Sequence, residues 1–311
     1  MDLNNKICVV GGGYWGKNHI KTLNELGALG GIVDTNQEAL SSFAINYPNA
    51  YLFSSLESAL SQIDLTGYVL STPAETHFEL AKIILSAGKS LLVEKPFTLN
   101  IKDAKELVEL SKKNSVNLMV GHLLLFHPAI MKIKELISQG QIGKLKYIYC
   151  NRVNMGKIRT KENVFWSLAP HDISIFQYLT DSYPKNIKAN GSVLLQDGIF
   201  DSTITYLKYP NNIEGHIFSS WLHPFKEHRL VVIGSEGMIV FNDSEKTSPL
   251  FFYPNKIEIL NGNPTEIKGD SVEIIYDKKM PLKNELKYFI SHLNNKINKA
   301  NALHALDVTR I

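Results

Sequence analysis

The stretch ICVVGGGYWGKNH, residues 7–19, places a glycine-rich turn between an apolar strand pattern and a helix pattern. Four apolar residues, Ile7–Val10, are typical of a buried strand, and helical spacing runs on from Asn18. Gly11, Gly13 and Gly16 follow the spacing Gly-x-Gly-x-x-Gly. In that motif the first glycine permits a tight turn, the second lets the backbone approach a pyrophosphate, and the third lets the helix pack on the strand. Because a helix N-terminus attracts phosphate, the stretch predicts a dinucleotide site.

Asp34 completes this pattern at the end of the next apolar run. It lies 18 residues after Gly16, where an acid binds the adenosine ribose hydroxyls and repels a 2′-phosphate. The alternative is a solvated acid in a turn. No arginine follows, since the next residues are Thr35, Asn36 and Gln37. The sequence therefore predicts NAD as the cofactor, in preference to NADP.

Composition narrows the class of protein. The chain of 311 residues is long enough for two domains, and 44% hydrophobic with 20% charged residues is ordinary for a globular protein. A net charge of +3 without a basic block argues against nucleic acid as a partner. Cys8 and Cys150 are the two cysteines, with no CxxC pair and no cluster of metal ligands, so no metal site is expected.

Targeting and membrane signals are not found. The segment MDLNNK, residues 1–6, has no long apolar core of a signal peptide. No stretch reaches the roughly 18 uncharged apolar residues of a membrane span. We expect a cytoplasmic protein with no membrane partner.

Strand and helix patterns alternate over the first 120 or so residues, which predicts an α/β fold with a doubly wound parallel sheet of the Rossmann type. The expected strands are 7–10, 31–33, 51–53, 67–70, 90–93 and 118–120, and the expected helices are 37–46, 56–61, 77–87 and 101–113.

The alternation of strand and helix patterns ends after Gly121, and several strand patterns then follow one another. This predicts a second α/β domain with an open, largely antiparallel sheet. Its expected helices are 128–138 and 172–179, and its expected strands are 145–153, 202–209, 213–221, 229–233 and 238–241. We therefore expect a cofactor domain over 1–122 and a substrate-binding and oligomerisation domain over 123–311, with the reacting groups in the cleft between them.

The segment SLLVEKPFTL, residues 90–99, carries the first candidate for catalysis. A strand brings Glu94, Lys95 and Pro96 to its carboxyl end, where doubly wound sheets bind ligands. Proline restricts Lys95 to extended backbone, and the Lys95–Pro96 bond is a candidate cis peptide. A fixed ammonium suits a hydroxyl that loses its proton as hydride leaves the same carbon. A charged turn at a strand end is the alternative.

Several motifs together resemble the Gfo/Idh/MocA family of sugar and inositol dehydrogenases. They are GGGYWGKNH, the stretch 71–96, GHLLLFHPA at 121–129, RVNMGKIRT, WSLAPHDIS and the stretch 220–238. The resemblance implies NAD(P)-dependent oxidation of an alcohol, or reduction of a ketone, on a carbohydrate. It implies that Lys95 and His171 are catalytic. Many members place an aspartate one turn before the histidine, where this chain has Ser167, so a Lys–Asp–His triad is in doubt.

Within the family the likeness is to enzymes that oxidise the 3-hydroxyl of a nucleotide sugar such as UDP-N-acetylglucosamine for surface-glycan or lipopolysaccharide synthesis. A nucleotide diphosphate needs several cations. The candidate substrate residues are His122, Arg152, Asn154, Arg159, His171, Lys226 and Arg229. Ordinary surface charges are the alternative for each cation, and His127 is as readily a structural histidine. A ketoreductase of a keto-deoxysugar nucleotide, an inositol or free-sugar dehydrogenase and a non-catalytic NAD-binding regulator stay open.

Further residues are expected to bind the cofactor. Ser71, Thr72 and Pro73 close the fourth strand, in a turn that the family places beneath the nicotinamide ribose. His77 opens the next helix, although capping by Thr76 explains that position equally well. The rest of the expected set is Gly11, Gly13, Tyr14, Trp15, Gly16, Asp34, Glu94 and Lys95, with packing as the alternative for the two aromatic residues.

The C-terminal part predicts a helix over 282–294 that returns toward the first domain, followed by a short last helix or a truncated end. We also expect a homo-oligomer, a dimer or tetramer formed through the C-terminal sheet.

Overall fold

A computed structural model describes residues 6–245, 247 and 249–311. Residues 1–5, on which the expectation about a signal peptide largely rests, lie outside that part. The chain divides into two compact units. The first is Met1–Phe126 with Lys279–Arg310, and the second is His127–Lys278 with Ile311. The C-terminal helices are grouped with the first unit, whereas the predicted boundary puts 123–311 in the second domain, with a C-terminal helix that returns toward the first.

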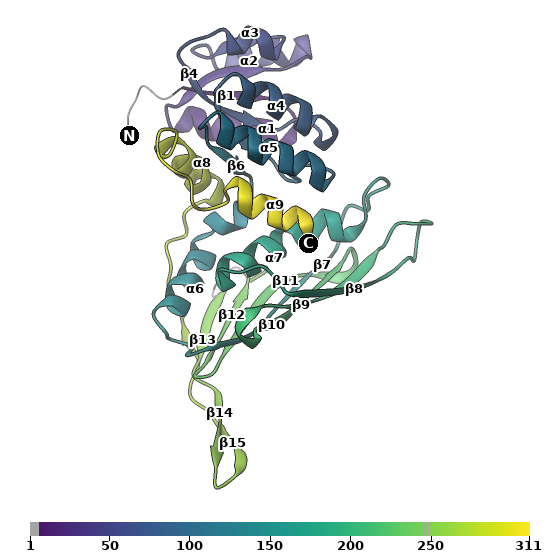
Figure 1. The fold of residues 1–311 in the computed structure, drawn as a ribbon, viewed down its shortest axis with the longest axis vertical. Helices are drawn as coiled ribbons and strands as arrows, with labels where there is room; N and C mark the ends of the chain where they lie inside the picture. Colours follow the sequence, from purple (N-terminus) through teal and green to yellow (C-terminus); the bar gives the residue numbers. More distant parts are fainter. Residues whose placement is uncertain (1–5, 246, 248) are drawn as a thin grey trace. The chain divides into compact units, whose positions relative to one another are not determined.

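The first unit holds a six-stranded parallel sheet with the order β3-β2-β1-β4-β5-β6 (Figure 1). Its strands are β1 (Lys6–Val10), β2 (Leu29–Val33), β3 (Tyr51–Phe53), β4 (Leu65–Leu70), β5 (Ser90–Val93) and β6 (Leu118–Val120). Its helices are α1 (Tyr14–Glu25), α2 (Gln37–Asn46), α3 (Leu56–Leu60), α4 (His77–Ser86), α5 (Ile101–Lys113), α8 (Pro281–Ser291) and α9 (Ala302–Arg310). Short 3₁₀ turns are η1 (Ala74–Thr76) and η2 (Leu123–Phe126).

Alternating side chains of these strands feed two apolar layers, because successive residues of a strand point to opposite faces. Cys8 and Val10 join a buried cluster with α3, α4, α5 and α9. On the other face α8 covers the sheet closely, since a Cβ built at Gly67 would stand 2.7 Å from Leu293 Cδ2 and 3.4 Å from Phe289 Cε1. Helices on both faces leave the carboxyl ends of the strands as the place for a ligand.

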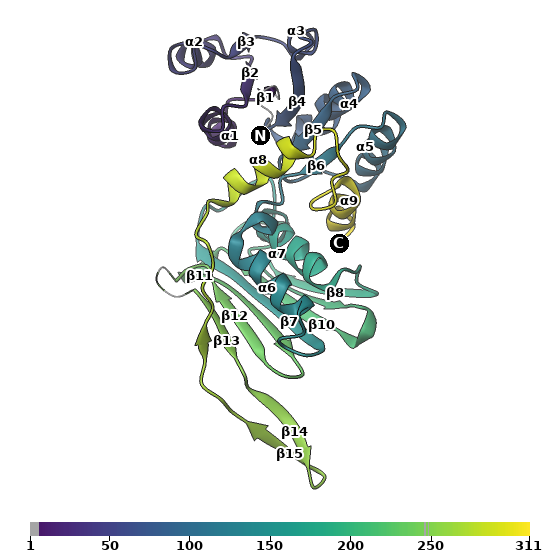
Figure 2. The same ribbon diagram turned by 90° about the vertical axis from the view of Figure 1, so that its left-hand side faces the viewer.

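The second unit is an eight-stranded sheet with the order β16-β13-β12-β11-β7-β10-β9-β8. Its strands are β7 (Leu145–Met155), β8 (Asn186–Ser192), β9 (Ser202–Lys208), β10 (Glu214–Ser220), β11 (Leu222–Gly234), β12 (Met238–Asn242), β13 (Leu250–Tyr253) and β16 (Val272–Glu273). The pair β10–β7 is parallel and the others are antiparallel. Helices α6 (Pro128–Ser138) and α7 (Val164–Thr180) lie against one face of this sheet (Figure 2). A 3₁₀ turn, η3 (Pro210–Asn212), joins β9 to β10, and a hairpin of β14 (Lys256–Leu260) and β15 (Asn263–Ile267) follows β13.

The fold class predicted from the sequence is confirmed, although several bounds differ. Helix α7 begins at Val164 rather than Asp172, because Asn163 caps it by accepting a hydrogen bond from the Trp166 N–H at 3.0 Å. Strand β11 begins at Leu222, seven residues before the predicted start at Arg229. Among the described residues no helix is both long and apolar enough to cross a membrane.

Candidate functional site

The glycine turn after β1 has the geometry that a dinucleotide needs. Gly11 has φ +92°, and a Cβ there would stand 2.8 Å from Thr72 Cγ2. At Gly16 a Cβ would stand 1.8 Å from the Gly11 carbonyl oxygen, so only glycine allows this approach of helix and turn. Around Gly13 nothing lies within 4 Å of a built Cβ. The first and third glycines therefore serve close packing, while the second borders open space where a pyrophosphate fits.

Helix α1 begins at this open space, and within the described residues neither a side-chain cap nor an acidic residue engages the amide groups of its first turn. Gly13 is its N-cap, no side chain of the described part caps it, and its first turn holds no acidic residue. The first N–H groups of a helix have no partner inside the helix and carry a partial positive charge. The turn is thus suited to a phosphate group.

Asp34 lies beside the same turn. Its Oδ2 accepts the Gly12 N–H at 2.7 Å and its Oδ1 accepts the Asn36 N–H at 2.9 Å. A pocket of about 250 Å³ is lined by Asp34, the glycine turn, Ser54–Leu56, Ser71–Pro73 and Leu80. All of these residues belong to the first unit. They fit a dinucleotide, with a pyrophosphate at the glycines and a ribose at the Asp34 carboxylate.

The Lys95–Pro96 bond is cis, as the sequence suggested, and follows β5 directly. Glu94, just before it, is buried and points inward. Its Oε1 lies 2.7 Å from His19 Nε2, and its Oε2 accepts the Lys95 backbone N–H at 3.1 Å. Both carboxylate oxygens thus have partners within the protein, and a role of Glu94 in binding the cofactor stays a prediction.

His77 lies between two backbone carbonyls, and its role at the cofactor stays a prediction. The residue is only 1% exposed. Its Nδ1 lies 2.8 Å from the Pro96 carbonyl oxygen, and its Nε2 lies 3.0 Å from the Thr72 carbonyl oxygen. Both nitrogens thus face backbone of the protein. Thr76 does not cap the helix, because its hydroxyl donates to the Pro73 carbonyl at 2.7 Å.

A group of buried ionisable residues surrounds Lys95 in the first unit. His122 follows β6, and its ring lies 5.4 Å from that of His304 on α9. Burial lowers the pKa of His122 well below its usual value, and His304 and the Lys95 ammonium lower it further. Burial also lowers the pKa of His304 to about 4. Both rings are therefore neutral at pH 7, and neither His122 nitrogen has a partner among the described residues.

Glu285 on α8 is a second buried acid near Glu94. It is 1% exposed, and burial raises its pKa well above the usual value, with a further rise from the Glu94 charge. Neither carboxyl oxygen has a hydrogen-bond partner in the described part of the chain. A neutral carboxylic acid is the form that such burial favours.

Tyr14 and Trp15 open helix α1 on the protein surface. Tyr14 is 82% exposed and Trp15 is 39% exposed, and their rings meet edge to face at 5.9 Å. Their exposure leaves the role of aromatic surface for a cofactor as a proposal.

In the second unit His171 and Ser167 lie four residues apart on α7, so both belong to one face of that helix. Pro170 sits between them and removes one helical hydrogen bond. His171 and Ser167 are both half-buried. The His171 carbonyl oxygen accepts a hydrogen bond from the Ser174 hydroxyl at 2.7 Å. The catalytic role of His171 stays a prediction.

Arg152 differs from the expectation of an open cation for a diphosphate. It is buried, and its Nε and Nη2 each donate to Asp172 at 2.8 Å in a two-pronged pair. The Cys150 thiol donates to the same carboxylate at 2.9 Å. Arg152 thus ties strand β7 to helix α7 beside His171.

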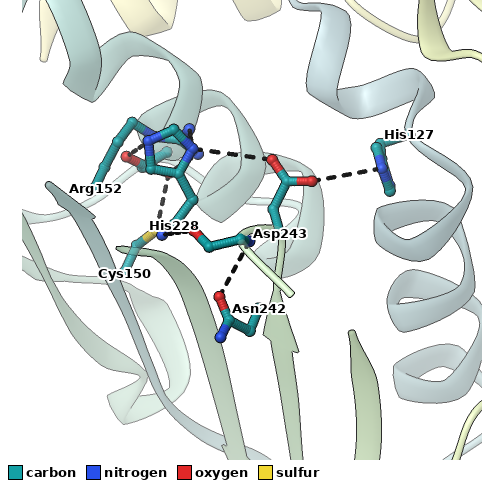
Figure 3. A network of polar contacts seen from close by, with 8 residues as sticks. His127, Cys150, Arg152, His228, Asn242 and Asp243 are labelled. Atoms are coloured by element: carbon teal, nitrogen blue, oxygen red, sulfur yellow. Dashed lines mark hydrogen bonds and ion pairs between the residues drawn. The ribbon is translucent and has the colours of Figure 1, made fainter. Parts of the chain in front are cut away.

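The polar network continues to two histidines and Asp243 (Figure 3). His228 Nδ1 lies 3.4 Å from Arg152 Nη1 and 3.9 Å from Asp243 Oδ2. On the other side His127 Nε2 lies 4.0 Å from Asp243 Oδ1. His127 Nδ1 accepts the Ala129 N–H at 3.2 Å, so His127 is the N-cap of α6. The structural interpretation of His127 is the one that this contact favours.

The other candidate substrate residues lie on β7, on the segment after it and on β11. Asn154 is half-buried near the end of β7, and Arg159 is exposed after it, with Nε 3.5 Å from Glu162. Lys226 is exposed on β11, and Arg229 Nη2 lies 2.7 Å from Glu227. No group of three His, Cys, Asp or Glu side chains in the described residues could hold a metal ion.

The first unit is a dinucleotide-binding Rossmann domain, joined to a unit with a mostly antiparallel sheet. Residues 5–122 match a family described as an oxidoreductase family with an NAD-binding Rossmann fold, and residues 130–240 match the GFO/IDH/MocA C-terminal domain. The chain belongs to the Gfo/Idh/MocA family of oxidoreductases.

Known proteins of this family are similar over much of the chain. UDP-N-acetylglucosamine 3-dehydrogenase of Acidithiobacillus ferrooxidans is 30% identical over 61% of this chain, and the match spans 58% of that relative. The NAD-dependent scyllo-inositol 2-dehydrogenase of Bacillus subtilis is 29% identical over 55% of this chain and 53% of its own length. A solved structure of the Acidithiobacillus ferrooxidans enzyme has a TM-score of 0.85 at 22% identity, covering 98% of this chain and 94% of that one.

Sequence reasoning missed His19, Glu285 and His304, because each comes close to Glu94 or His122 only through folding. It also missed Ser54 and Ser55 of the cofactor pocket. A signal for those two exists, since they follow the third strand, and the carboxyl ends of parallel strands share one edge.

Proposed function

We propose that the protein is an NAD-dependent oxidoreductase that oxidises a ring hydroxyl, the 3-hydroxyl, of a nucleotide sugar such as UDP-N-acetylglucosamine. The observation that carries the proposal is the Lys95–Pro96 turn, linked through His77 to Thr72 of the dinucleotide pocket. The name of the relative from Acidithiobacillus ferrooxidans supports the substrate class.

NAD is the cofactor that these residues favour. Asp34 stands at the pocket with one carboxylate oxygen on Gly12 and the other on Asn36, and its charge opposes a 2′-phosphate. Lysine and arginine are absent from the described residues that line the pocket. When bound, NAD would accept hydride from the sugar carbon.

Lys95 assists the loss of the hydroxyl proton in this mechanism. Its ammonium stabilises the oxygen as negative charge develops, or its neutral amine takes the proton directly. His171 orients the same oxygen by a hydrogen bond. Ser167 can donate or accept a hydrogen bond but does not act as a base alone, so Lys95 and His171 carry the chemistry.

A direct test screens purified protein with NAD against UDP- and dTDP-linked sugars and free inositols. Because the oxidation can be unfavourable in isolation, the assay is coupled to an aminotransferase that consumes the keto product. We expect turnover with UDP-N-acetylglucosamine and little with inositol. Turnover of inositol without any nucleotide sugar would refute the substrate class, and the inositol dehydrogenase among the relatives makes that the second candidate.

Association of copies through the second unit is part of the same proposal. Its sheet carries helices α6 and α7 on one face (Figure 2). Strands β7, β9 and β10 bear an aromatic cluster. In it the ring centroids of His216 and Tyr149 stack 5.1 Å apart, and His216 Nδ1 is hydrogen-bonded to the Tyr147 hydroxyl at 2.8 Å. Tyr206 beside it is 49% exposed. Sedimentation of the purified protein tests this, and a monomer at micromolar concentration would contradict it.

A further inference from the structure

The Lys95–Pro96 turn is held on one side by His77. The ring bridges the Pro96 carbonyl at 2.8 Å and the Thr72 carbonyl at 3.0 Å. A neutral imidazole donates to one of these carbonyls, and a doubly protonated ring donates to both. In either state the ring fills the space between the two turns and has no room to move, since it is buried. Thr72 lines the dinucleotide pocket, so this contact joins the catalytic turn to one cofactor-binding segment.

The same turn is held on its other side by His19. His19 is fully buried on α1, three residues after Gly16, and its Nε2 donates to Glu94 Oε1 at 2.7 Å. The other oxygen of Glu94 accepts the Lys95 N–H at 3.1 Å. The chain of contacts therefore runs from the glycine helix through His19 and Glu94 to the backbone of Lys95.

We propose that His19 and His77 are positioning residues, which fix the Lys95–Pro96 turn to the two segments that bind the dinucleotide. The proposal rests on the proposed function, in which Lys95 acts on a hydroxyl beside the cofactor. Neither histidine touches the reacting atoms. Their effect is on the position of the Lys95 backbone. The lysine side chain has four rotatable bonds, so its ammonium reaches one particular oxygen only if the backbone is held in the right place.

The physical reason is that hydride transfer needs the cofactor and the proton acceptor at the right distance and orientation relative to each other. A misplacement of about 1 Å can lower a rate by about 100-fold, and loss of a supporting hydrogen bond behind a catalytic group typically costs about 10- to 100-fold. Cofactor affinity should change little, because the glycine turn and Asp34 stay in place. The two histidines should therefore act on turnover more than on binding.

The experiment compares two pairs of variants in the full-length protein with NAD. His77→Phe removes both carbonyl contacts, while His77→Asn keeps an amide donor near the position of Nδ1. His19→Phe removes the contact with Glu94, while His19→Gln keeps a donor near the position of Nε2. Tyr68→Phe is the matched control, since it removes a buried hydrogen bond to the Ala59 carbonyl, 3.0 Å long, elsewhere in the same unit.

We expect kcat for the sugar to fall about 10- to 100-fold in both Phe variants, with the NAD Kd within about threefold of wild type. The Asn and Gln variants should recover most of the loss, and the control should keep wild-type kcat. If His19→Phe does not fold, Glu94→Gln replaces it, because it keeps the shape and loses one acceptor. If His77→Phe does not fold, His77→Leu replaces it, because it also removes both carbonyl contacts. Wild-type kcat in folded Phe variants, or equal losses in the Phe and conservative variants, would overturn the proposal.

A second readout needs no substrate. Brief labelling with limiting acetic anhydride, followed by mass spectrometry, gives the reactivity of Lys95 relative to Lys102 on α5. We expect that ratio to change at least about threefold in the Phe variants and to stay constant in the control. A changed ratio in a protein that turns over no sugar would sink the proposed function and leave the positioning role standing. An unchanged ratio in both Phe variants would overturn the positioning role.

Discussion

Asp34 is the residue on which we base the proposed preference for NAD. Its carboxylate accepts the amides of Gly12 and Asn36 at the edge of the pocket. Hydrogen bonds from ribose hydroxyls to a carboxylate are strong, whereas a 2′-phosphate there meets like charge. We therefore propose that this side chain sets the preference between the two nicotinamide cofactors.

Replacing Asp34 by Ala should therefore erode the preference. In the unmodified protein we expect NAD to bind at least about tenfold more tightly than NADP, a difference of about 1.4 kcal/mol. Asp34→Ala should weaken NAD and leave NADP similar or slightly stronger. Titration of protein fluorescence with each cofactor measures both constants. Equal constants in the unmodified protein would show that Asp34 does not meet the ribose.

Lys95→Ala tests the proton step. General acid–base assistance is worth about 100- to 10,000-fold, so turnover should fall by that much or more. The NAD Kd should stay within about tenfold, since the pocket is lined by other residues. Steady-state rates and cofactor titration on the same preparation separate the two effects. Wild-type turnover in Lys95→Ala would remove Lys95 from the mechanism.

Among the elements, helix α7 depends on one buried ion pair. Arg152 on β7 donates two hydrogen bonds of 2.8 Å to Asp172, and the Cys150 thiol donates a third to the same carboxylate. Asp172 directly follows His171, so the pair fixes the rotation of the helix at the candidate catalytic histidine.

Arg152→Ala should leave the Asp172 charge buried without its cationic partner. Loss of one member of a buried pair costs about 3–5 kcal/mol, which corresponds to a fall of about 6 °C or more in the unfolding midpoint. Lys132→Ala is the control, because its pair with Glu135 is at the surface and contributes little to stability. Thermal unfolding followed by circular dichroism measures both. Equal midpoints for the two variants would contradict the role of the pair.

Helix α9 makes the first unit sensitive to acid through His304. Burial lowers the pKa of this ring in the folded protein to about 4, below its usual 6.5. Between about pH 6.5 and pH 4 the unfolded chain binds the extra proton and the folded chain does not. Stability should therefore fall as the pH drops through that window, and His122 adds to the effect with the same sign.

His304→Phe should flatten this pH dependence, because it removes the buried ring whose pKa is lowered. Unfolding midpoints at half-unit steps from pH 4 to pH 8 give the slope for each protein. A slope in His304→Phe equal to that of wild type would show that this ring does not titrate on unfolding.

Elements with strong apolar alternation could be predicted from the sequence, and polar ones could not. Strand β8 was missed because nearly all of its residues are exposed, so it has no apolar face to signal a strand. The hairpin β14–β15 is an exception, because it was missed although Ile257 and Ile259 alternate with charged residues in β14. Helix α7 was shortened because Pro170 interrupts the pattern, although Asn163 gave a usable capping signal.

The candidate site follows the same division. Gly11, Gly16 and Asp34 could be predicted because a local motif fixes their chemistry. The neighbours of Glu94 and His122 could not, since His19, Glu285 and His304 come from α1, α8 and α9, far apart in the sequence. The Arg152–Asp172 pair was also hidden, because a basic residue in a sequence does not reveal a buried acid 20 positions away.

The whole molecule combines one unit for the dinucleotide with one unit that carries His171 and the exposed cations Arg159 and Lys226. Lys95 belongs to the first unit and His171 to the second. The net charge of +3 is modest, and the cations that a diphosphate needs are therefore a local property of β7, β11 and the segment after β7.

The most direct test of the central claim follows the hydrogen atom itself. The protein is incubated with NAD and UDP-N-acetylglucosamine that carries deuterium at C3, and the reduced cofactor is analysed by mass spectrometry. The account predicts NADH one mass unit heavier than in a reaction with unlabelled sugar, and no such product with Lys95→Ala in the same time. Unlabelled NADH from the C3-deuterated sugar, or labelled NADH from C2-deuterated inositol alone, would contradict it.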